Sequence, residues 1–363
     1  MSLTRRVGLV GYGSAGRKIH SRLLREAGLR VTHVVTRSPE RTAAAREDWP
    51  GVTVVPSIDA LLDDAAALDL VVIASPTAEH AHQAHAALAA GLPVVVDKPL
   101  ATTTEAARAL ARDAEGSGGR LTVFQNRRWD PEQLTLQSVI AAGELGRVHR
   151  FERRWERWRP EPQRRWKEQD LIGGGLLLDL GAHLVDSAIQ LFGAVTSVYA
   201  ELRSITTPAE DDVFLALTHR PAPDGAVVIS HLQASGLTGA PGPRTRVLGD
   251  KGAFLVTSYE GEPTPFEVLD ETWAAHGGDD VGGWLVHGAE RIAVPRAPGG
   301  HEDYYRAVER WLDDGAPPPV DPWDAVRTAA VLDAARVSAS EHRVVAIGPA
   351  TSGTPTHVPE ARG

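Results

Sequence analysis

Cysteine is absent from this chain of 363 residues. Disulfide bonds, thiolate nucleophiles and cysteine-ligated zinc or iron–sulfur sites are therefore excluded. The sequence also lacks any run of the ~18 consecutive apolar residues that a membrane-spanning helix requires. Positive charge is in deficit, because 38 Lys and Arg stand against 47 Asp and Glu, for a formal net charge of −9. These absences argue against membrane proteins and nucleic-acid binders.

The N-terminal segment carries Thr4-Arg5-Arg6, which is similar to a twin-arginine export signal. Such a signal needs an apolar region of ~7–15 residues and a cleavage site of small residues. Here the apolar run 7–10 ends at once in a glycine-rich segment. We therefore expect a cytoplasmic location.

The composition that is present is typical of a globular protein, with 42% hydrophobic and 23% charged residues. The length predicts two domains, each able to bury a core. In residues 1–124 short apolar runs alternate with segments of helical period, which predicts a doubly wound α/β domain with a parallel sheet buried on both faces. The helices are expected at 17–26, 79–90 and 104–116, the last preceded by Thr102 and Glu105 at capping-box spacing, and the strands at 7–10, 30–36, 52–55, 70–73, 93–96 and 121–124.

A glycine-rich loop follows the first expected strand directly. It reads Gly11-Tyr12-Gly13-Ser14-Ala15-Gly16, the G-x-G-x-x-G pattern at the start of a helix. The glycines permit a tight turn and a close approach of the backbone to a pyrophosphate, which would lie at the positive N-terminus of the helix. Such a loop can also be a plain turn, but here strand, turn and helix occur in the required order. We therefore predict a Rossmann domain that binds a dinucleotide through residues 11–16.

The end of the second strand indicates which dinucleotide binds. NAD sites usually have an Asp or Glu about 20 residues after the glycines, which accepts a hydrogen bond from the ribose 2′-hydroxyl. This chain has Arg37 and Ser38 there, which can bind a 2′-phosphate that a carboxylate would repel. The alternative is that Arg37 is a solvated loop residue and Glu40 contacts the ribose. NADP is favoured as the cofactor, and NAD stays open.

Two further loops are expected at the crevice where the strand order reverses. Ser75, Pro76 and Thr77 follow the fourth strand and should line the crevice opposite the glycine loop. Asp97 and Lys98 follow the fifth strand, which places Lys98 near the nicotinamide end of an extended dinucleotide. A lysine before a proline is usually only solvated, so position alone leaves its role open.

Residues 125–347 change to longer runs in which apolar and polar residues alternate, as in a sheet covered on one face. We predict a second domain of α+β type with a large, mainly antiparallel open sheet. Residues 348–363 form a polar tail that we expect to be mobile. The expected strands are 148–155, 198–205, 213–219, 226–233, 245–248 and 253–256, and helices are expected near 303–312 and 323–340.

An apolar segment at 173–189 has the length of a buried helix and carries Asp179, His183 and Asp186. Spacings of four and three residues place all three on one helical face. Buried ionisable groups are unfavourable unless paired, so this stripe indicates a mutual network or a polar cavity. One alternative is that Asp179 and His183 form an internal pair that ties the helix to the sheet. Asp186 by itself is more typical of a structural contact.

Two other patterns carry less weight. The segment 150–167 is rich in Arg and Trp and superficially resembles a nucleic-acid patch, which the overall negative charge argues against. His80, His82 and His85 share a helix, but no carboxylate completes a metal set at the right spacing. We expect His82 and His85 at the surface, His80 packed against the crevice loop, and no metal.

Four motifs occur in the order typical of one known family. They are the glycine loop, the segment 75–80, Asp97-Lys98-Pro99 and the segment 174–183. On these motifs the chain resembles the Gfo/Idh/MocA oxidoreductases over nearly its whole length. The segments 125–130 and 165–168 look most like the NADP-dependent scyllo-inositol dehydrogenase branch of that family.

The resemblance implies a role for each matching residue. Lys98 would bind the reacting oxygen, Asp179 would orient the substrate, and His183 would be the acid/base. A cis bond before Pro99 is implied, as is a homodimer or homotetramer built on the open face of the second sheet. The full set of expected cofactor contacts is residues 11–16, Arg37, Ser38, Ser75, Pro76, Thr77, His80, Asp97, Lys98, Gln125, Trp166 and Lys167, and the expected substrate contacts are Lys98, Arg128, Trp129, Asp179 and His183.

Two residues depart from the family pattern. Asp97 stands where glutamate is usual, which shortens the acid beside Lys98 by one methylene group. Lys167 stands where arginine commonly follows Trp166, which replaces a planar fork of donors by a point charge.

Together these residues predict reversible hydride transfer between NADP(H) and a secondary alcohol of a cyclic polyol or sugar, similar to an inositol. Two alternatives stay open. One is a ketoreductase for a nucleotide-activated sugar, whose diphosphate would bind the basic segment after Arg150. The other is a dinucleotide-sensing regulatory protein without catalysis. In each case we expect a small-molecule partner, no nucleic acid and no membrane association.

Overall fold

The structure is a computed structural model that describes residues 5–257 and 280–348. By their contacts these residues form two compact units. The first contains 5–126 and 300–329, and the second contains 127–257, 280–299 and 330–348. Of the expected polar tail, residues 349–363 lie outside the described residues.

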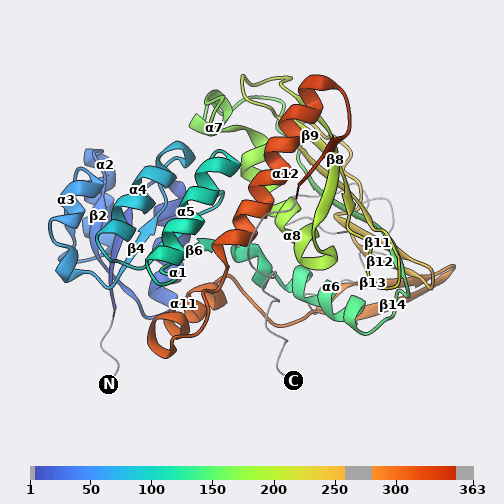
Figure 1. Cartoon of the computed structure of the whole chain (residues 1–363), viewed down its shortest axis with the longest axis horizontal. Coiled ribbons are helices and arrows are strands. Elements are labelled where there is room, and N and C mark those ends of the chain that lie inside the picture. The colour runs from blue at the N-terminus through green and yellow to red at the C-terminus, as the bar shows by residue number, and fades with distance from the viewer. Residues whose placement is uncertain (1–4, 258–279, 349–363) are drawn as a thin grey trace. The chain divides into compact units, whose positions relative to one another are not determined.

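A six-stranded parallel sheet forms the centre of the first unit, in the order β3-β2-β1-β4-β5-β6 (blue to cyan in Figure 1). This confirms the predicted Rossmann fold. All four residues of β4 are fully buried, as expected for a strand that is covered on both faces. The strands are β1 (Arg6–Val10), β2 (Arg30–Val35), β3 (Thr53–Val55), β4 (Leu70–Ile73), β5 (Val94–Asp97) and β6 (Leu121–Phe124).

Helices connect these strands. Helix α4 packs on β4 and β5 and against α5, and α1 packs on β2 and against α11. Helix α2 was not predicted, because its ten residues are mostly polar and exposed and show no apolar stripe. The helical segments are η1 (Ser14–His20), α1 (Ser21–Glu26), α2 (Pro39–Asp48), α3 (Ile58–Leu62), η2 (Ala65–Ala67), α4 (Thr77–Ala89), α5 (Thr104–Gly116) and α11 (Glu302–Asp314).

The capping residue of α5 differs from the prediction. Thr103, not Thr102, is the N-cap, and its hydroxyl accepts a hydrogen bond from the backbone N–H of Ala106 at 3.3 Å. The third helical residue is then Ala106, so Glu105 cannot complete a capping box. The helix itself begins and ends where the sequence predicted.

Residues 300–329 belong to the first unit, although they follow most of the second unit in the sequence. Tyr304 and Tyr305 of α11 are fully buried, with ring centroids 4.9 and 5.8 Å from that of Phe124 in β6. The sequence assigned all of 125–347 to the second domain, and residues 300–329 depart from that assignment. The helix was predicted, but its packing partner Phe124 lies about 180 residues away in the sequence.

A nine-stranded sheet forms the centre of the second unit, in the order β14-β13-β12-β11-β7-β10-β9-β8-β15. Only the central pair β7 and β10 is parallel among the described pairings, which confirms the mainly antiparallel sheet. The strands are β7 (Val148–Glu156), β8 (Val195–Arg203), β9 (Asp212–His219), β10 (Ile229–Ser235), β11 (Thr245–Gly249), β12 (Ala253–Val256), β13 (Val281–His287), β14 (Glu290–Pro295) and β15 (Val345–Ala346).

Helix α8 packs on β7 and β10 and closes the core of this unit. Val185 of α8 and Phe151 of β7 are both completely buried there. Helix α12 runs from residues of the first unit into the second. The helical segments are η3 (Asn126–Trp129), α6 (Pro131–Ala141), α7 (Trp166–Gln169), η4 (Leu177–Gly181), α8 (Ala182–Phe192) and α12 (Pro322–Glu341).

Some predicted strand positions in this unit are shifted, and some strands were missed. Strand β8 begins three residues before the predicted start, and β10 begins three residues after it. Strands β13 and β14 were not predicted, because Gly282 and Gly283 interrupt the apolar run of the first and most of the second is exposed.

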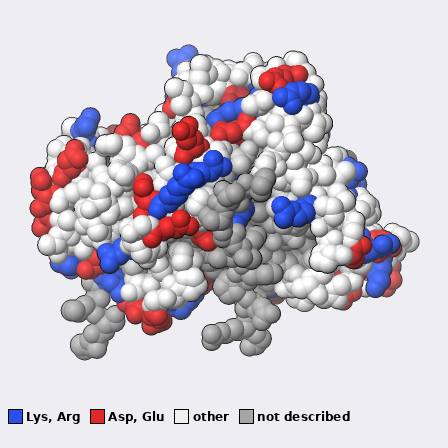
Figure 2. All heavy atoms as spheres, viewed as in Figure 1, with Lys and Arg blue, Asp and Glu red and all other residues white. Residues whose placement is uncertain are grey.

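On the face drawn in Figure 2, acidic and basic side chains are intermixed. Ion pairs at the surface join Arg22 to Glu26 and Arg306 to Asp303. Within the ranges that the structure describes, no helix has both the length and the apolar composition needed to cross a membrane.

Candidate active site

The glycine loop joins β1 to η1 as predicted. Gly11 has a φ of +91°, and a Cβ there would lie 2.7 Å from the carbonyl oxygen of Ala74. A Cβ on Gly16 would lie 2.0 Å from the carbonyl oxygen of Gly11. Both positions therefore exclude any side chain. A Cβ on Gly13 would meet only the end of the Arg41 side chain, at 3.9 Å, so the loop is open above this residue.

These features fit a bound dinucleotide. The backbone N–H groups at the start of η1 are not opposed by any acidic side chain in the first turn. Tyr12 contributes only backbone to the loop surface, because its ring is buried and its hydroxyl donates to Asp48 at 2.8 Å. Burial raises the pKa of Tyr12 to about 12.

Two exposed arginines follow β2, and the guanidinium of one of them, Arg41, lies beside Gly13 of the glycine loop. Arg37 is exposed, with its Nε donating to the carbonyl of Pro56 at 3.2 Å. The hydroxyl of Ser38 caps α2 by accepting from the N–H of Arg41 at 3.3 Å. Arg41 lies in the first turn of this helix, which the sequence did not predict, and so it was missed as a candidate.

The loop after β4 is tied to the loop after β5 by a buried histidine. Nδ1 of His80 lies 2.9 Å from the carbonyl of Pro99, and Nε2 lies 2.9 Å from the carbonyl of Ser75. Burial lowers the pKa of His80. The prediction that His80 packs against the crevice loop is confirmed. Thr77 is buried at the start of α4, and the Ser75 hydroxyl donates to Gln83 at 2.7 Å.

Lys98 lies on the loop at the carboxyl end of β5, and the bond between it and Pro99 is cis, as the resemblance implied. Oδ1 of Asp97 accepts a hydrogen bond from the backbone N–H of Lys98 at 2.8 Å. Burial on its own would raise the pKa of Asp97, but His20, Lys98 and His80 outweigh it and lower the pKa to about 2. Asp97 therefore stays ionised beside Lys98 at every physiological pH.

The predicted helix 173–189 is two segments in the second unit. The wide turn η4 has π-type hydrogen bonding and is followed by α8. Because π-type turns hold more residues than α-helical turns, the spacing rule for one face does not carry across η4. Asp179 lines one cavity of this unit, and His183 and Asp186 line another.

The cavity beside Asp179 has an empty volume of about 650 Å³. Nζ of Lys167 lies 2.5 Å from Oδ1 of Asp179, which forms an ion pair between α7 and η4. Trp166 precedes this lysine and is 41% exposed. The start of η4 is capped from another loop, since Glu210 accepts from the N–H of Leu177 at 3.2 Å.

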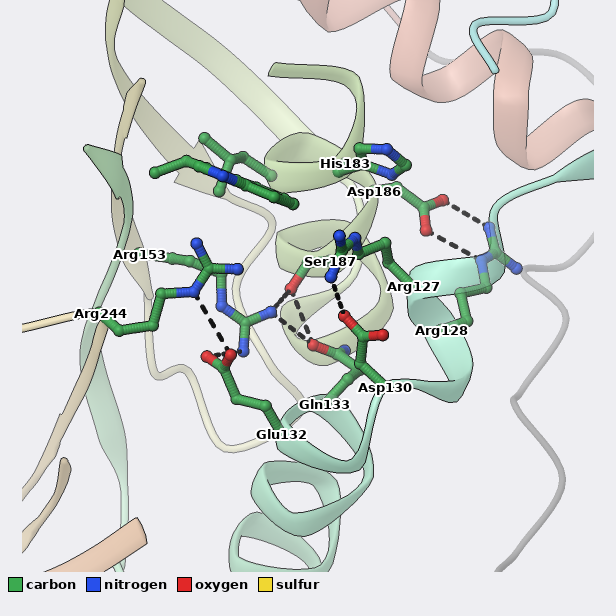
Figure 3. A pocket seen from close by; sticks show the side chains of 12 residues that line it. Arg127, Arg128, Asp130, Glu132, Gln133, Arg153, His183, Asp186, Ser187 and Arg244 are labelled. Carbon is green, nitrogen blue, oxygen red and sulfur yellow. Dashed lines mark hydrogen bonds and ion pairs between the residues drawn. The ribbon is translucent and has the colours of Figure 1, made fainter. Parts of the chain in front are cut away.

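The cavity beside His183 has an empty volume of about 390 Å³ and is shown in Figure 3. Four arginine side chains from three segments of the chain point into it, and each meets a carboxylate. Arg127 donates to Asp130 at 2.9 Å, and Arg128 forms a bidentate pair with Asp186 at 2.9 and 2.6 Å. The guanidinium of Arg128 is thus already bound by a carboxylate of α8, although we expected it to contact substrate.

A second group of charged side chains, joined by hydrogen bonds, also lines this cavity. Arg153 donates to Glu132 at 3.1 Å and to Gln133 at 2.7 Å, and Arg244 reaches Glu132 at 3.4 Å (Figure 3). Burial raises the pKa of Glu132, but Arg153 and Arg244 outweigh this effect and hold it below its usual value. The guanidinium of Arg244 also lies 4.4 Å from the centroid of Trp155.

Two of the residues predicted to contact substrate or cofactor are buried. Trp129 is 8% exposed, and Gln125 is 2% exposed, with an Oε1 that accepts no hydrogen bond within the described part of the chain. No group of three or more potential ligands among the described residues could hold a metal ion.

Comparison with known protein families identifies both units. The family model described as "Oxidoreductase family, NAD-binding Rossmann fold" matches residues 5–125. A second, "Oxidoreductase family, C-terminal alpha/beta domain", matches residues 137–347, and both models carry the Gfo/Idh/MocA name. The chain belongs to the Gfo/Idh/MocA family of oxidoreductases. The resemblance inferred from the motifs is confirmed.

Relatives within this family match along nearly the whole chain. The oxidoreductase YdgJ of Escherichia coli is 35% identical over 94% of this chain and 98% of its own length. The scyllo-inositol 2-dehydrogenase (NADP(+)) IolW of Bacillus subtilis is 29% identical over 94% of this chain and 96% of its own. The crystal structure of an oxidoreductase from Klebsiella pneumoniae is 34% identical, covers 95% of both chains and has a TM-score of 0.78.

As a Gfo/Idh/MocA member the chain is an NAD(P)-binding oxidoreductase, and its relatives agree with a dehydrogenase that acts on CH–OH groups. The sequence missed the arginines of the cavity beside His183 that come from β7 and the β10–β11 connection, Arg153 and Arg244. The only signal for Arg153 was the basic segment 150–167, and Arg244 had none. Neither residue's position in the sequence shows that it would pair with Glu132.

Proposed function

We propose that this chain catalyses reversible hydride transfer between NADP(H) and a secondary alcohol of a neutral cyclic polyol or sugar, with an inositol as the first candidate. The cavity beside His183 carries this proposal, because four guanidinium groups and three carboxylates line it. Such a lining offers many hydrogen-bond groups and little net charge, which suits a polyhydroxyl compound better than an anion. The activity named for IolW supports the same class of substrate.

Three side chains act on the substrate in this proposal. Lys98, as an ammonium, binds the reacting oxygen and stabilises the alkoxide that develops there. His183 removes the hydroxyl proton, since imidazole with a reference pKa of about 6.5 can exchange protons at neutral pH. Asp179 lines the other cavity, and its assignment to a neighbouring hydroxyl of the substrate rests on the family resemblance. Its ion pair with Lys167 fixes the carboxylate. The cofactor, when bound, supplies the acceptor or donor of the hydride.

A ketoreductase for nucleotide-activated sugars is less well supported. Its diphosphate would need a basic surface in the segment after residue 150. Four basic side chains of that segment do line the cavity beside Asp179, but five acidic side chains line the same cavity. The proposal also keeps a cytoplasmic location. It keeps a homodimer or homotetramer through the open sheet face as well, and light scattering would measure the number of subunits.

The first prediction concerns Lys98 and His183. Lys98→Ala and His183→Ala should each lower kcat/KM at least about 100-fold, because each removes a charge or proton-transfer group from the reacting atoms. The measurement is NADPH absorbance with NADP and a panel of inositols, aldoses and a UDP-sugar. Lys251→Ala and His82→Ala, which change exposed side chains outside the site, should keep full activity.

The outcomes of this assay separate the alternatives. Turnover of the UDP-sugar alone would favour the ketoreductase. No turnover at all, with NADPH still bound as judged from its fluorescence, would favour the regulatory protein. Full activity in either active-site variant would remove that residue from the mechanism.

The second prediction concerns the cofactor. Arg41→Ala and Arg37→Ala should each raise the KM for NADP about tenfold or more and leave the KM for NAD nearly unchanged, because a charged hydrogen bond to the 2′-phosphate is lost. Arg46→Ala in the last turn of the same helix is the matched control. Equal effects on the two cofactors would contradict NADP selectivity through these residues.

A further inference from the structure

Three polar side chains in the first unit form a series of contacts that ends at the backbone of Lys98. Tyr305 of α11, His20 at the end of η1 and Asp97 at the end of β5 come from three separate elements. The Tyr305 hydroxyl lies 2.6 Å from Nδ1 of His20. Nε2 of His20 lies 3.8 Å from Oδ2 of Asp97, and Oδ1 of Asp97 accepts from the backbone N–H of Lys98 at 2.8 Å. These contacts therefore connect α11 to the loop that carries Lys98.

The His20 ring is held firmly in one orientation. Its side chain is completely buried, and its centroid lies 4.2 Å from that of Phe124 and 6.1 Å from that of Tyr305. Nε2 makes no hydrogen bond to any described residue, and 3.8 Å is too long for one to Asp97. The direction of this nitrogen is set by the Tyr305 hydroxyl at the opposite side of the ring.

The position of the proton on His20 follows from the groups that face it. If Nε2 carried no proton, its lone pair would point at an ionised carboxylate and be repelled. With a proton on Nε2, the N–H points at Oδ2 of Asp97 and attracts it. In this arrangement the neutral ring accepts from Tyr305 at Nδ1, and a charged ring donates to Tyr305 there. Either way, an N–H faces Asp97.

Asp97 transmits this orientation to Lys98. One of its oxygens faces His20 and the other holds the lysine backbone N–H, so the carboxylate cannot turn without losing one contact. The groups that act electrostatically on Asp97 are His20, Lys98 and His80. His80 fixes the next part of the loop through the carbonyl of Pro99.

We propose that His20 and Tyr305 are positioning residues that hold Asp97, and through it Lys98, in the geometry needed for hydride transfer. The inference rests on the proposed function, in which Lys98 binds the reacting oxygen. Neither residue touches the reacting atoms.

Kinetics of four variants test the role. Tyr305→Phe removes only the hydroxyl, and His20→Leu removes the N–H. Each should lower kcat about tenfold while the KM for NADP stays within about twofold, because small displacements of a binding group reduce the rate more than cofactor affinity. His20→Gln, whose amide can place an N–H near the position of Nε2, should recover most of the loss.

Tyr304→Phe is the matched control, since Tyr304 is equally buried in the same aromatic cluster but its hydroxyl donates to Thr122. It should keep the wild-type kcat. Equal losses in Tyr304→Phe and Tyr305→Phe would reduce the role of Tyr305 to packing and overturn the proposal. A kcat for His20→Leu within twofold of wild type would overturn it too.

A second readout needs neither substrate nor cofactor. In ¹⁵N NMR of histidine-labelled protein, with the His20 signals assigned by their absence in His20→Gln, Nε2 should be protonated at pH 7. An unprotonated Nε2 would overturn the inference even if polyols are oxidised. If the protein oxidises no polyol but Nε2 is protonated, the proposed function is wrong and the contacts from Tyr305 to Lys98 still stand.

Discussion

A buried ion pair in the cavity beside His183 should contribute more to stability than an ion pair at the surface. Arg128 and Asp186 form a bidentate pair whose side chains are 2% and 5% exposed. Removing the charge of Asp186 takes its ionic partner away from a buried guanidinium. Asp186→Asn should therefore lower the free energy of unfolding by about 3–5 kcal/mol, measured by urea denaturation at pH 7.

The control for this prediction is a pair at the surface. Asp333 and Arg336 are each 34% exposed, and such pairs contribute about 1 kcal/mol or less. Asp333→Asn should therefore change the urea midpoint little. Losses of similar size in the two variants would show that the buried pair is not special.

The sequence predicted the positions of two loops but not the pairing of side chains from distant segments. The glycine loop and the Asp97-Lys98-Pro99 loop were placed correctly, because strand, turn and helix follow each other locally. Asp186 was expected to be structural, but its partner Arg128 lies 58 residues away and was expected to face substrate. Pairings across such separations depend on packing, which local patterns do not report.

Helix ends provide the next prediction. The Thr103 hydroxyl satisfies the N–H of Ala106, one of the first N–H groups of α5 that have no partner within the helix. Thr103→Ala should lower the free energy of unfolding by about 1 kcal/mol, measured by thermal or urea denaturation. Thr103→Ser keeps the hydroxyl and should stay close to wild type, and an equally destabilised Thr103→Ser would show that the methyl group matters instead.

Elements with a strong local pattern were predicted and those without one were missed. All six strands of the parallel sheet were found, because each is a short apolar run between helical segments. Helix α2 has no apolar face and β14 is mostly exposed, so neither gives a periodic signal. The wide turn η4 follows no simple periodicity, which is why Asp179 was expected on the same face as His183.

Acid should destabilise the chain as a whole through buried histidines in both units. Burial lowers the pKa of His219 to about 4 and lowers that of His80 as well. His219 is completely buried, with Nδ1 2.9 Å from the carbonyl of Gly193 and Nε2 2.8 Å from the Ser230 hydroxyl. Between pH 6.5 and 4 the unfolded chain binds a proton at this residue and the folded chain does not. The stability is thus complete above about pH 6.5 and is lost as the pH falls towards 4.

His219 should account for about 2–3 kcal/mol of the stability lost between pH 7 and pH 4.5. Asp97 does not contribute in this range, because its pKa of about 2 confines its effect to below the ordinary aspartate value. Urea denaturation at the two pH values measures the loss for the wild type and for His219→Gln, which cannot titrate. The variant should be less stable at pH 7 but should lose distinctly less on acidification. An unchanged loss would show that His219 is already charged in the folded protein or that the acid sensitivity comes from other groups.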